Sequence, residues 1–229
     1  MHFNILTLFP EFFPGPLSAS ITGKALEKGL WSFHATNIRD FAKDNYRSVD
    51  DTPFGGGAGM VMRADILEPA FLSITNPGRR LYLGPRGRPL TQQGVEELGQ
   101  EDNMTLLCGR YEGVDQRFLD VYEFEEISIG DYVLAGGEIP AMVLMEACIR
   151  LIPGAVGNAR TPIEESFSDN LLEYPQYTKP ATWTTKDGDA YDVPEILRSG
   201  DHKKIEKWRR EKSLEITRAM RPDLLNKQG

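Results

Sequence analysis

Three apolar segments in the middle of the chain each run into a glycine-containing loop, and this pattern restricts the fold more than any other feature of the sequence. The segments are RRLYLGPRG (79–87), MTLLCGRYEG (104–113) and EEISIGDYVLAGG (125–137). Earlier in the chain, strand-like residues 2–9 and 32–38 flank a helix-like stretch at 21–29, and residues 62–74 return to helical spacing. This alternation predicts an α/β fold with a mostly parallel sheet.

The glycine loops are expected to surround a single pocket. In open α/β sheets, ligands bind beyond the carboxyl ends of the strands. Three consecutive strands that all end in glycine loops would bring those loops together there. Glycines also occur simply because turns require them, so the pattern by itself leaves a purely structural role open.

The second half of the chain divides into a helix, a connector and a small domain. Residues 141–154 (AMVLMEACIRLIPG) predict a nearly all-apolar helix, stopped by Pro153–Gly154 and buried against the sheet and against another subunit. A polar connector follows, then an irregular, proline-punctuated stretch at 171–183 and helices at about 194–199 and 201–220. We therefore predict a large domain over 1–156, a linker over 157–170 and a small, mostly helical domain over 171–229.

The composition excludes several kinds of site. The two cysteines, Cys108 and Cys148, lie in apolar stretches, and the three histidines are scattered. Structural zinc, a disulfide framework and a Cys/His nucleophile are therefore excluded, and both cysteines are expected to be buried in a protein of the reducing cytoplasm. No apolar run approaches the ~18 residues that a membrane span needs, so no membrane association is expected.

The net charge of −8 argues against a general nucleic-acid coating protein. The segment DHKKIEKWRREK (201–212) nevertheless holds six basic and three acidic residues around Trp208. Such a run is commonly a solvated helix face, so charge by itself does not assign it to RNA.

The loop chemistry excludes two common nucleotide sites. No loop carries the lysine of a phosphate-binding P-loop, and the first strand runs into Phe9-Pro10-Glu11 without a Gly-x-Gly-x-x-Gly fingerprint. The pocket is then built from main-chain groups, apolar side chains and the acids Glu112, Asp131 and Glu138. Such a pocket suits an uncharged base joined to a cationic group, and S-adenosylmethionine has this character.

Four motifs carry a resemblance to a known family. GGGAGM (55–60), LLCGRYEGVD (106–115), SIGDYVLAGGEIPAM (128–142) and YPQYTKP (174–180) together resemble the bacterial tRNA (guanine-N1)-methyltransferase, or TrmD, family. The resemblance implies a SPOUT-type parallel sheet with a deep trefoil knot and a homodimer, although knots are in general essentially absent from proteins. It also implies transfer of a methyl group from S-adenosylmethionine to N1 of the guanosine immediately 3′ of the anticodon in tRNA.

The resemblance assigns the methyl donor to the three loops of the large domain, and the small domain to tRNA. By motif match, the donor-binding residues are Tyr82, Leu83 and Gly84 from the first loop, Gly109, Tyr111 and Glu112 from the second, and Ile129, Gly130, Asp131, Tyr132, Val133, Leu134, Gly136, Gly137 and Pro140 from the third.

The reaction requires two further groups, because N1 of neutral guanine carries a proton and negative charge develops on O6 when that proton leaves. Arg150 stands where the family's catalytic arginine falls, although Glu146 at i−4 also allows an ordinary helix salt bridge. The family places its general base, an aspartate, before Ser-Phe or Ser-His, and here that position is Glu165. Asp169 is the alternative base.

Two segments are assigned to the RNA substrate through the resemblance. The polar loop is expected to hold the flipped guanosine through Asp50, Asp51, Gly55, Gly56, Gly57 and Gly59. The basic run is expected to contact the tRNA backbone through Lys203, Lys204, Lys207, Arg209 and Arg210. Magnesium is associated with the family, but no carboxylate cluster in the sequence locates a metal site. The competing interpretations are a non-catalytic RNA-binding module, which the presence of Arg150 and a carboxylate disfavours, and a dehydrogenase.

Overall fold

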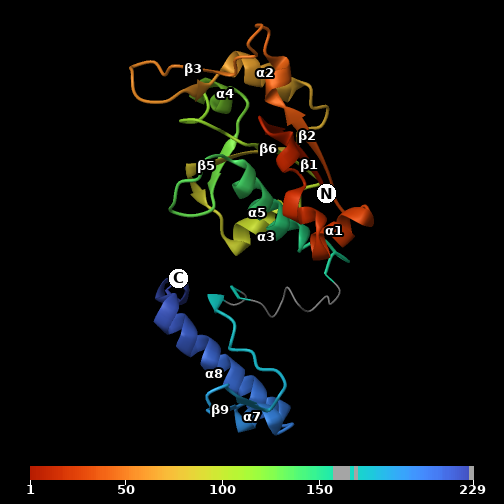
Figure 1. The fold of residues 1–229 in the computed structure, drawn as a ribbon, viewed down its shortest axis with the longest axis vertical. Helices are drawn as coiled ribbons and strands as arrows, with labels where there is room; N and C mark the ends of the chain where they lie inside the picture. Colours follow the sequence, from red (N-terminus) through yellow and green to blue (C-terminus); the bar gives the residue numbers. More distant parts are fainter. Residues whose placement is uncertain (157–165, 168–169, 227–229) are drawn as a thin grey trace. The chain divides into compact units, whose positions relative to one another are not determined.

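The computed structural model describes residues 1–156, 166–167 and 170–226. The chain forms two compact units, Met1–Ala159 and Arg160–Gly229, called here the N-terminal and C-terminal units (Figure 1). The N-terminal unit holds the central sheet, and the C-terminal unit contains a long helix and a short hairpin.

The central sheet has five strands, and every pairing in it is parallel. Its order is β2-β1-β6-β5-β7. The strands are β1 (His2–Thr7), β2 (Ser32–Asn37), β5 (Arg79–Pro89), β6 (Asn103–Leu107) and β7 (Glu125–Ser128). All five carboxyl ends therefore lie along one edge, and the loops after β5, β6 and β7 come from three neighbouring strands.

Helices cover both faces of the sheet, because successive strand side chains point to opposite sides. In β5, Leu81 and Leu83 enter one apolar cluster and Tyr82 enters the other. The first cluster packs against α1 (Ser20–Glu27), α3 (Gln92–Leu98) and α5 (Glu138–Ile149). The second packs against α2 (Ala64–Leu72) and α4 (Gln116–Val121).

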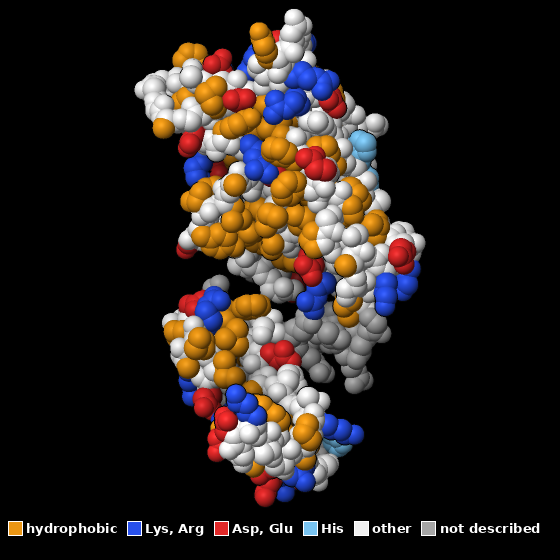
Figure 2. Space-filling model, in the orientation of Figure 1, with side chains coloured by type: hydrophobic (Ala, Val, Ile, Leu, Met, Phe, Trp, Pro, Cys, Tyr) orange, Lys and Arg blue, Asp and Glu red, His pale blue; other side chains and the backbone are white. Residues whose placement is uncertain are grey.

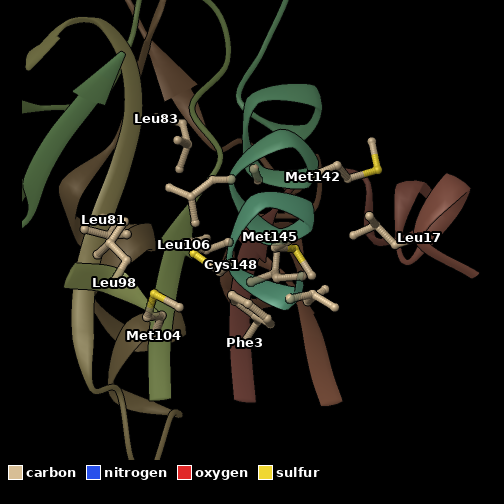
Figure 3. Close-up of a cluster of buried hydrophobic side chains, with 14 of the residues drawn as sticks. Phe3, Leu17, Leu81, Leu83, Leu98, Met104, Leu106, Met142, Met145 and Cys148 are labelled. Carbon is tan, nitrogen blue, oxygen red and sulfur yellow. The ribbon is translucent and has the colours of Figure 1, made fainter. Parts of the chain in front are cut away.

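Helix α5 is the main apolar support of the first face. Met145 and Cys148 lie beside Phe3 and Leu106 of the strands, whereas Met142 points toward Leu17 on the other side of the helix, as Figure 3 shows. Full burial of an aliphatic side chain of this size contributes about 1.5–3 kcal/mol, so the helix is fixed firmly to the sheet. Its N-terminal turn is consequently held at the strand ends, directly behind the third glycine loop.

The first glycine loop interrupts the pairing between β5 and β7, which resumes beyond it. Leu83 and Arg88 both pair with Ile127 of β7, so residues 84–87 bulge out of the sheet. At Gly87 a Cβ atom would lie 2.3 Å from the main-chain nitrogen of Ile127, which no side chain could tolerate. Glycine is required here because two backbones meet.

The remaining elements are short, apart from one helix. The N-terminal unit also contains three 3₁₀ turns, Pro10–Phe12, Gly15–Ser18 and Ile38–Phe41, and the antiparallel pair β3 (Asp50–Asp51) and β4 (Val61–Met62). The C-terminal unit contains the hairpin β8 (Thr182–Thr184) and β9 (Ala190–Asp192), then α7 (Glu195–Arg198), α8 (His202–Met220) and α9 (Pro222–Leu225).

The structure confirms the α/β class and the parallel sheet, and it corrects several boundaries. Helix α5 begins at Glu138 and ends at Ile149, whereas the sequence predicted 141–154. The earlier start is compatible with Pro140, because a proline in the first turn removes no intrahelical hydrogen bond. The hairpin β8–β9 was missed, since the prolines before it pointed to irregular structure.

Candidate functional site

A cavity of about 200 Å³ lies at the carboxyl edge of the sheet, where the three glycine loops meet. Every donor-binding residue that the motifs predicted lines this cavity except Asp131, which is exposed outside the lining. The structure thus brings together residues that lie up to 58 positions apart in the sequence, from Tyr82 to Pro140.

Close packing explains why glycines stand at the contacts between these loops. The N–H of Gly137 donates to the carbonyl of Gly109 at 2.9 Å. A Cβ at Gly137 would lie 2.7 Å from the Cα of Cys108, and one at Gly109 would lie 2.7 Å from the ring of Tyr82. The second and third loops therefore run directly against each other at the cavity wall.

One lining residue has a strained backbone. Tyr111 has φ +60°, in the left-handed region that residues other than glycine seldom adopt. It is half exposed and follows Gly109 and Arg110 in the second loop. Strain of this kind, of order 1–3 kcal/mol, is concentrated at functional sites in proteins.

The cavity lining carries a net negative charge. In the lining, all of which belongs to the described part of the chain, Arg110 and Glu112 are the charged residues. The guanidinium of Arg110 is neutralised by Glu138, at 2.9 Å between Nη2 and Oε2. This leaves the Glu112 carboxylate as the net charge, which disfavours a phosphate ligand and suits a cationic one.

Tyr82 forms a neutral wall of the cavity. Burial raises the pKa of its phenol, and the nearby Glu126 carboxylate raises it further, while Arg86 opposes the rise. The carboxylate of Glu126 lies 3.4 Å from Nη2 of Arg86. The Tyr82 phenol therefore stays protonated at neutral pH and can donate a hydrogen bond.

The polar loop predicted to hold guanosine adjoins the cavity. Its last strand, β4, runs beside the second loop, where the N–H of Met62 donates to the carbonyl of Gly113 at 2.9 Å. A Cβ at Gly59 would lie 2.4 Å from Cγ of Glu112. Asp50 and Asp51 form β3, and the four predicted glycines, Gly55, Gly56, Gly57 and Gly59, all have positive φ.

Arg150 lies at the opposite end of α5 from the cavity. It caps the C-terminus of the helix, twelve residues after the first helical position, Glu138. At 1.5 Å per residue this separation is about 18 Å along the axis. The structure therefore does not bring Arg150 to the cavity of its own chain. Glu165 and Asp169 lie outside the described residues.

The predicted basic residues do not all share one face of α8. Lys203, Lys207 and Arg210 follow the i, i+4, i+7 spacing, with Lys204 beside them. Arg209 points elsewhere, with its guanidinium 4.7 Å from the centroid of the Tyr174 ring. Arg209 and Arg210 both line a larger hollow of about 1030 Å³ within the C-terminal unit.

Sequence reasoning missed six lining residues, and all of them except Ile127 are next in sequence to a residue that was predicted to bind the donor. They are Pro85, Arg110, Gly113, Ile127, Ser128 and Ala135. Of these six, Arg110 could have been identified from the motif CGRYEG. A charged residue between glycines at a strand end requires a group of opposite charge nearby. Its partner Glu138 is buried and follows 28 positions later, so only the fold reveals the pair.

The described residues contain neither a cluster of metal ligands nor a membrane-spanning helix. No group of three or more histidine, cysteine, aspartate or glutamate side chains is placed to hold a metal ion there. Within the same residues, no helix is long and apolar enough to cross a membrane.

A parallel α/β sheet with a ligand cavity at its carboxyl edge defines a class of proteins that bind ligands through strand-end loops. A sequence profile of the family described as tRNA (Guanine-1)-methyltransferase TrmD matches residues 1–227. The chain belongs to this family of transferases.

Individual relatives are similar to this chain over nearly its whole length. A protein from Rhodospirillum rubrum, named tRNA (guanine-N(1)-)-methyltransferase, is 57% identical over 221 residues, which cover 96% of this chain and 90% of the relative. Proteins with the same name from Rhodopseudomonas palustris (strain BisB18) and Ehrlichia canis are 54% and 50% identical, over 96% and 98% of this chain and 87% and 95% of their own lengths.

Proposed function

We propose that this protein transfers the methyl group of S-adenosylmethionine to N1 of the guanosine immediately 3′ of the anticodon in tRNA. The family and the names of its relatives support the tRNA (guanine-N1) part of this proposal. The donor and the roles of individual residues are argued from the cavity. Because the substrate is tRNA, the reaction belongs in the cytoplasm.

The observation that carries the donor assignment is the charge of the cavity. Its arginine is neutralised by Glu138, and Glu112 remains at the wall. A sulfonium next to a carboxylate is favoured electrostatically, whereas a nucleoside phosphate would meet no unpaired cation. Main-chain N–H and C=O groups in the loops rich in glycine supply the hydrogen bonds that an adenine edge requires.

The chemistry requires a base for N1 and a positive group near O6. We assign the base to Glu165, with Asp169 as the alternative, and the positive group to Arg150. Magnesium remains a proposal without a site, because the described residues contain no ligand cluster.

We propose that the active form is a homodimer, because the position of Arg150 requires a second chain. Arg150 is about 18 Å along α5 from the cavity of its own chain, so the Arg150 that acts there would come from a partner. The outward face of α5 is apolar in its first two turns, where Ile139 and Val143 are 48% and 45% exposed, and the exposed Glu146 follows them. Figure 2 shows hydrophobic side chains gathered on the surface of the N-terminal unit where α5 lies in Figure 1.

We assign the SPOUT-type trefoil knot to the N-terminal unit, and the tight passage of Gly137 against Cys108 and Gly109 supports it. We assign tRNA backbone contacts to Lys203, Lys204, Lys207 and Arg210 of α8, which are exposed. Arg209, paired with Tyr174, is a weaker candidate. The domain limits 1–156, 157–170 and 171–229 are kept as proposed.

The function is tested by calorimetry and a methylation assay. S-adenosylmethionine is expected to bind the purified protein, and NAD is expected not to bind. A tRNA transcript with guanosine 3′ of the anticodon should then gain one methyl group at N1, and the same transcript with adenosine there should gain none. Donor binding without methyl transfer would instead support a non-catalytic RNA-binding module.

A further inference from the structure

Beneath the cavity wall lies a buried network around a single carboxylate. Glu138 is 1% exposed, although it is the first residue of α5 and is charged. Its Oε1 accepts a hydrogen bond from Oγ1 of Thr7 at 2.7 Å, and its Oε2 lies 2.9 Å from Nη2 of Arg110. A carboxylate removed from water in this way is costly unless it is paired, so its position is closely determined by its partners.

Arg110 extends this network to two other segments. Its guanidinium stacks over the ring of Phe9, 4.4 Å from the centroid, and its Nη1 donates to the carbonyl of Ala135 at 3.3 Å. The Arg110 side chain is 18% exposed, and therefore largely shielded from competing water. The residue holds the end of β1, the second loop and the third loop at one point.

The third loop is shaped around this arginine. A Cβ at Gly136 would lie 2.3 Å from Nε of Arg110, so the loop passes directly over the guanidinium. Ala135, Gly136 and Gly137 line the cavity, whereas Glu138 and Thr7 do not. Glu138 can therefore act on a ligand in the cavity through Arg110 and this loop.

We propose that the Arg110–Glu138 ion pair, secured by Thr7, is a positioning device that holds the third loop in the form that admits the methyl donor. This inference rests on the proposed function, because it takes S-adenosylmethionine as the ligand of the cavity. The pair fixes the loop before the donor arrives, so its loss weakens donor affinity. Loss of the pair leaves the rate of the methyl-transfer step itself unchanged.

Glu138→Gln provides the direct test. Glutamine keeps the shape and can still accept from Thr7, but it removes the charge that faces Arg110. The dissociation constant for S-adenosylmethionine, measured by calorimetry, should rise about tenfold or more. The kcat at saturating donor should stay within about twofold of the wild-type value, so the effect should appear in KM.

A matched control separates positioning from general loss of stability. Arg79→Lys weakens the partly buried Arg79–Glu125 ion pair between β5 and β7, which is 2.8 Å long and whose residues do not line the cavity. It should lower the melting temperature, as Glu138→Gln does, without changing donor affinity. An equal loss of donor affinity in both variants would overturn the proposal.

A double-mutant cycle completes the experiment. If Arg110 and Glu138 act as a unit, Arg110→Gln combined with Glu138→Gln should bind donor no worse than Arg110→Gln does. Additive losses would overturn the proposal. If Glu138→Gln does not fold, Thr7→Val carries the test, because valine keeps the shape of this fully buried side chain. It removes the hydrogen bond to Glu138 and the one that the Thr7 hydroxyl accepts from the N–H of Phe9, whose ring lies under Arg110. Donor binding should weaken about threefold, and unchanged affinity would overturn the inference. Failure of the wild-type protein to bind S-adenosylmethionine would instead overturn the proposed function.

Discussion

The main-chain N–H of Glu112 donates to the carbonyl of Met60 at 2.9 Å, and this bond joins the cavity to the glycine-rich loop before β4. Glu112 lines the cavity, and Met60 follows Gly59 in the segment assigned to the RNA substrate. The two proposed binding regions therefore share a wall, as a transfer between donor and nucleobase requires.

Gly59→Ala should disturb this shared wall. A methyl group there would collide with the Glu112 side chain, whose Cγ would be 2.4 Å away. We expect at least about a tenfold fall in kcat/KM for tRNA, since misplacement of this size is costly in a positioned site. Steady-state methylation assays would measure it.

Gly56→Ala is the matched control for that variant. Gly56 and Gly59 have nearly equal φ values, +80° and +82°, but a Cβ at Gly56 would meet nothing within 4 Å. Both substitutions impose the same backbone strain, so the difference between them isolates the Glu112 contact. Equal kinetic losses would show that the contact is unimportant.

Gly137→Ala should abolish donor binding, because the new methyl group would lie 2.7 Å from the main-chain Cα of Cys108 and neither backbone can yield. Gly29→Ala serves for comparison: it places alanine at φ +69° in open space, and left-handed strain costs about 1–2 kcal/mol. Both variants should lose stability in urea titrations, but only Gly137→Ala should lose affinity for S-adenosylmethionine. Normal donor binding by Gly137→Ala would contradict the cavity assignment.

Glu165→Gln should reduce methyl transfer at least about a hundredfold while donor binding persists, because the base that removes the N1 proton is lost. Single-turnover assays with preformed donor complex measure the chemical step directly. Asp169→Asn should be nearly as active as wild type. The reverse ranking would transfer the role of base to Asp169.

Arg150 can be tested by subunit complementation. Gly137→Ala inactivates the cavity of its own chain, and Arg150→Ala should inactivate the cavity of the partner. Mixed dimers of the two variants would then contain one intact composite site, and a random mixture should recover about a quarter of wild-type activity. No recovery in refolded mixtures would show that Arg150 does not act across the dimer.

The two cysteines should be unreactive in the folded protein. Burial raises the pKa of Cys148 to about 12, and it raises the pKa of Cys108 well above its usual range, with Glu138 as the second cause. Iodoacetamide at pH 8 should therefore modify neither thiol until denaturant is added, as mass spectrometry would record.

The same shifts predict a dependence of stability on pH. Both folded-state pKa values exceed the unfolded value of 9.0, so the contribution of the thiols is fully present below about pH 9. It is lost as pH rises, because the unfolded thiols ionise first. Cys148→Ala should reduce this loss of stability above pH 9 in urea titrations, and an unchanged slope would contradict the prediction.

The sequence by itself determined the α/β alternation, the parallel sheet and the location of the three loops. Hydrophobic periodicity and glycines at strand ends are local signals. They can be recognised in a few consecutive residues, without knowing which distant residues these contact in the fold. The motifs extended this to fourteen of the twenty residues that line the cavity, because each motif occupies one continuous loop. Thus Tyr82, Gly109 and Gly137 could be identified without coordinates.

Only the tertiary structure decided which of these residues act together and at what distance. The pairing of Arg110 with Glu138 and Thr7 joins three segments, and no periodicity in the chain encodes it. The separation of Arg150 from its own cavity likewise follows from the direction of α5, which the buried apolar face of the helix fixes against the sheet. Charges and catalytic groups acquire their partners through packing between segments distant in sequence, and packing is a property of the whole fold.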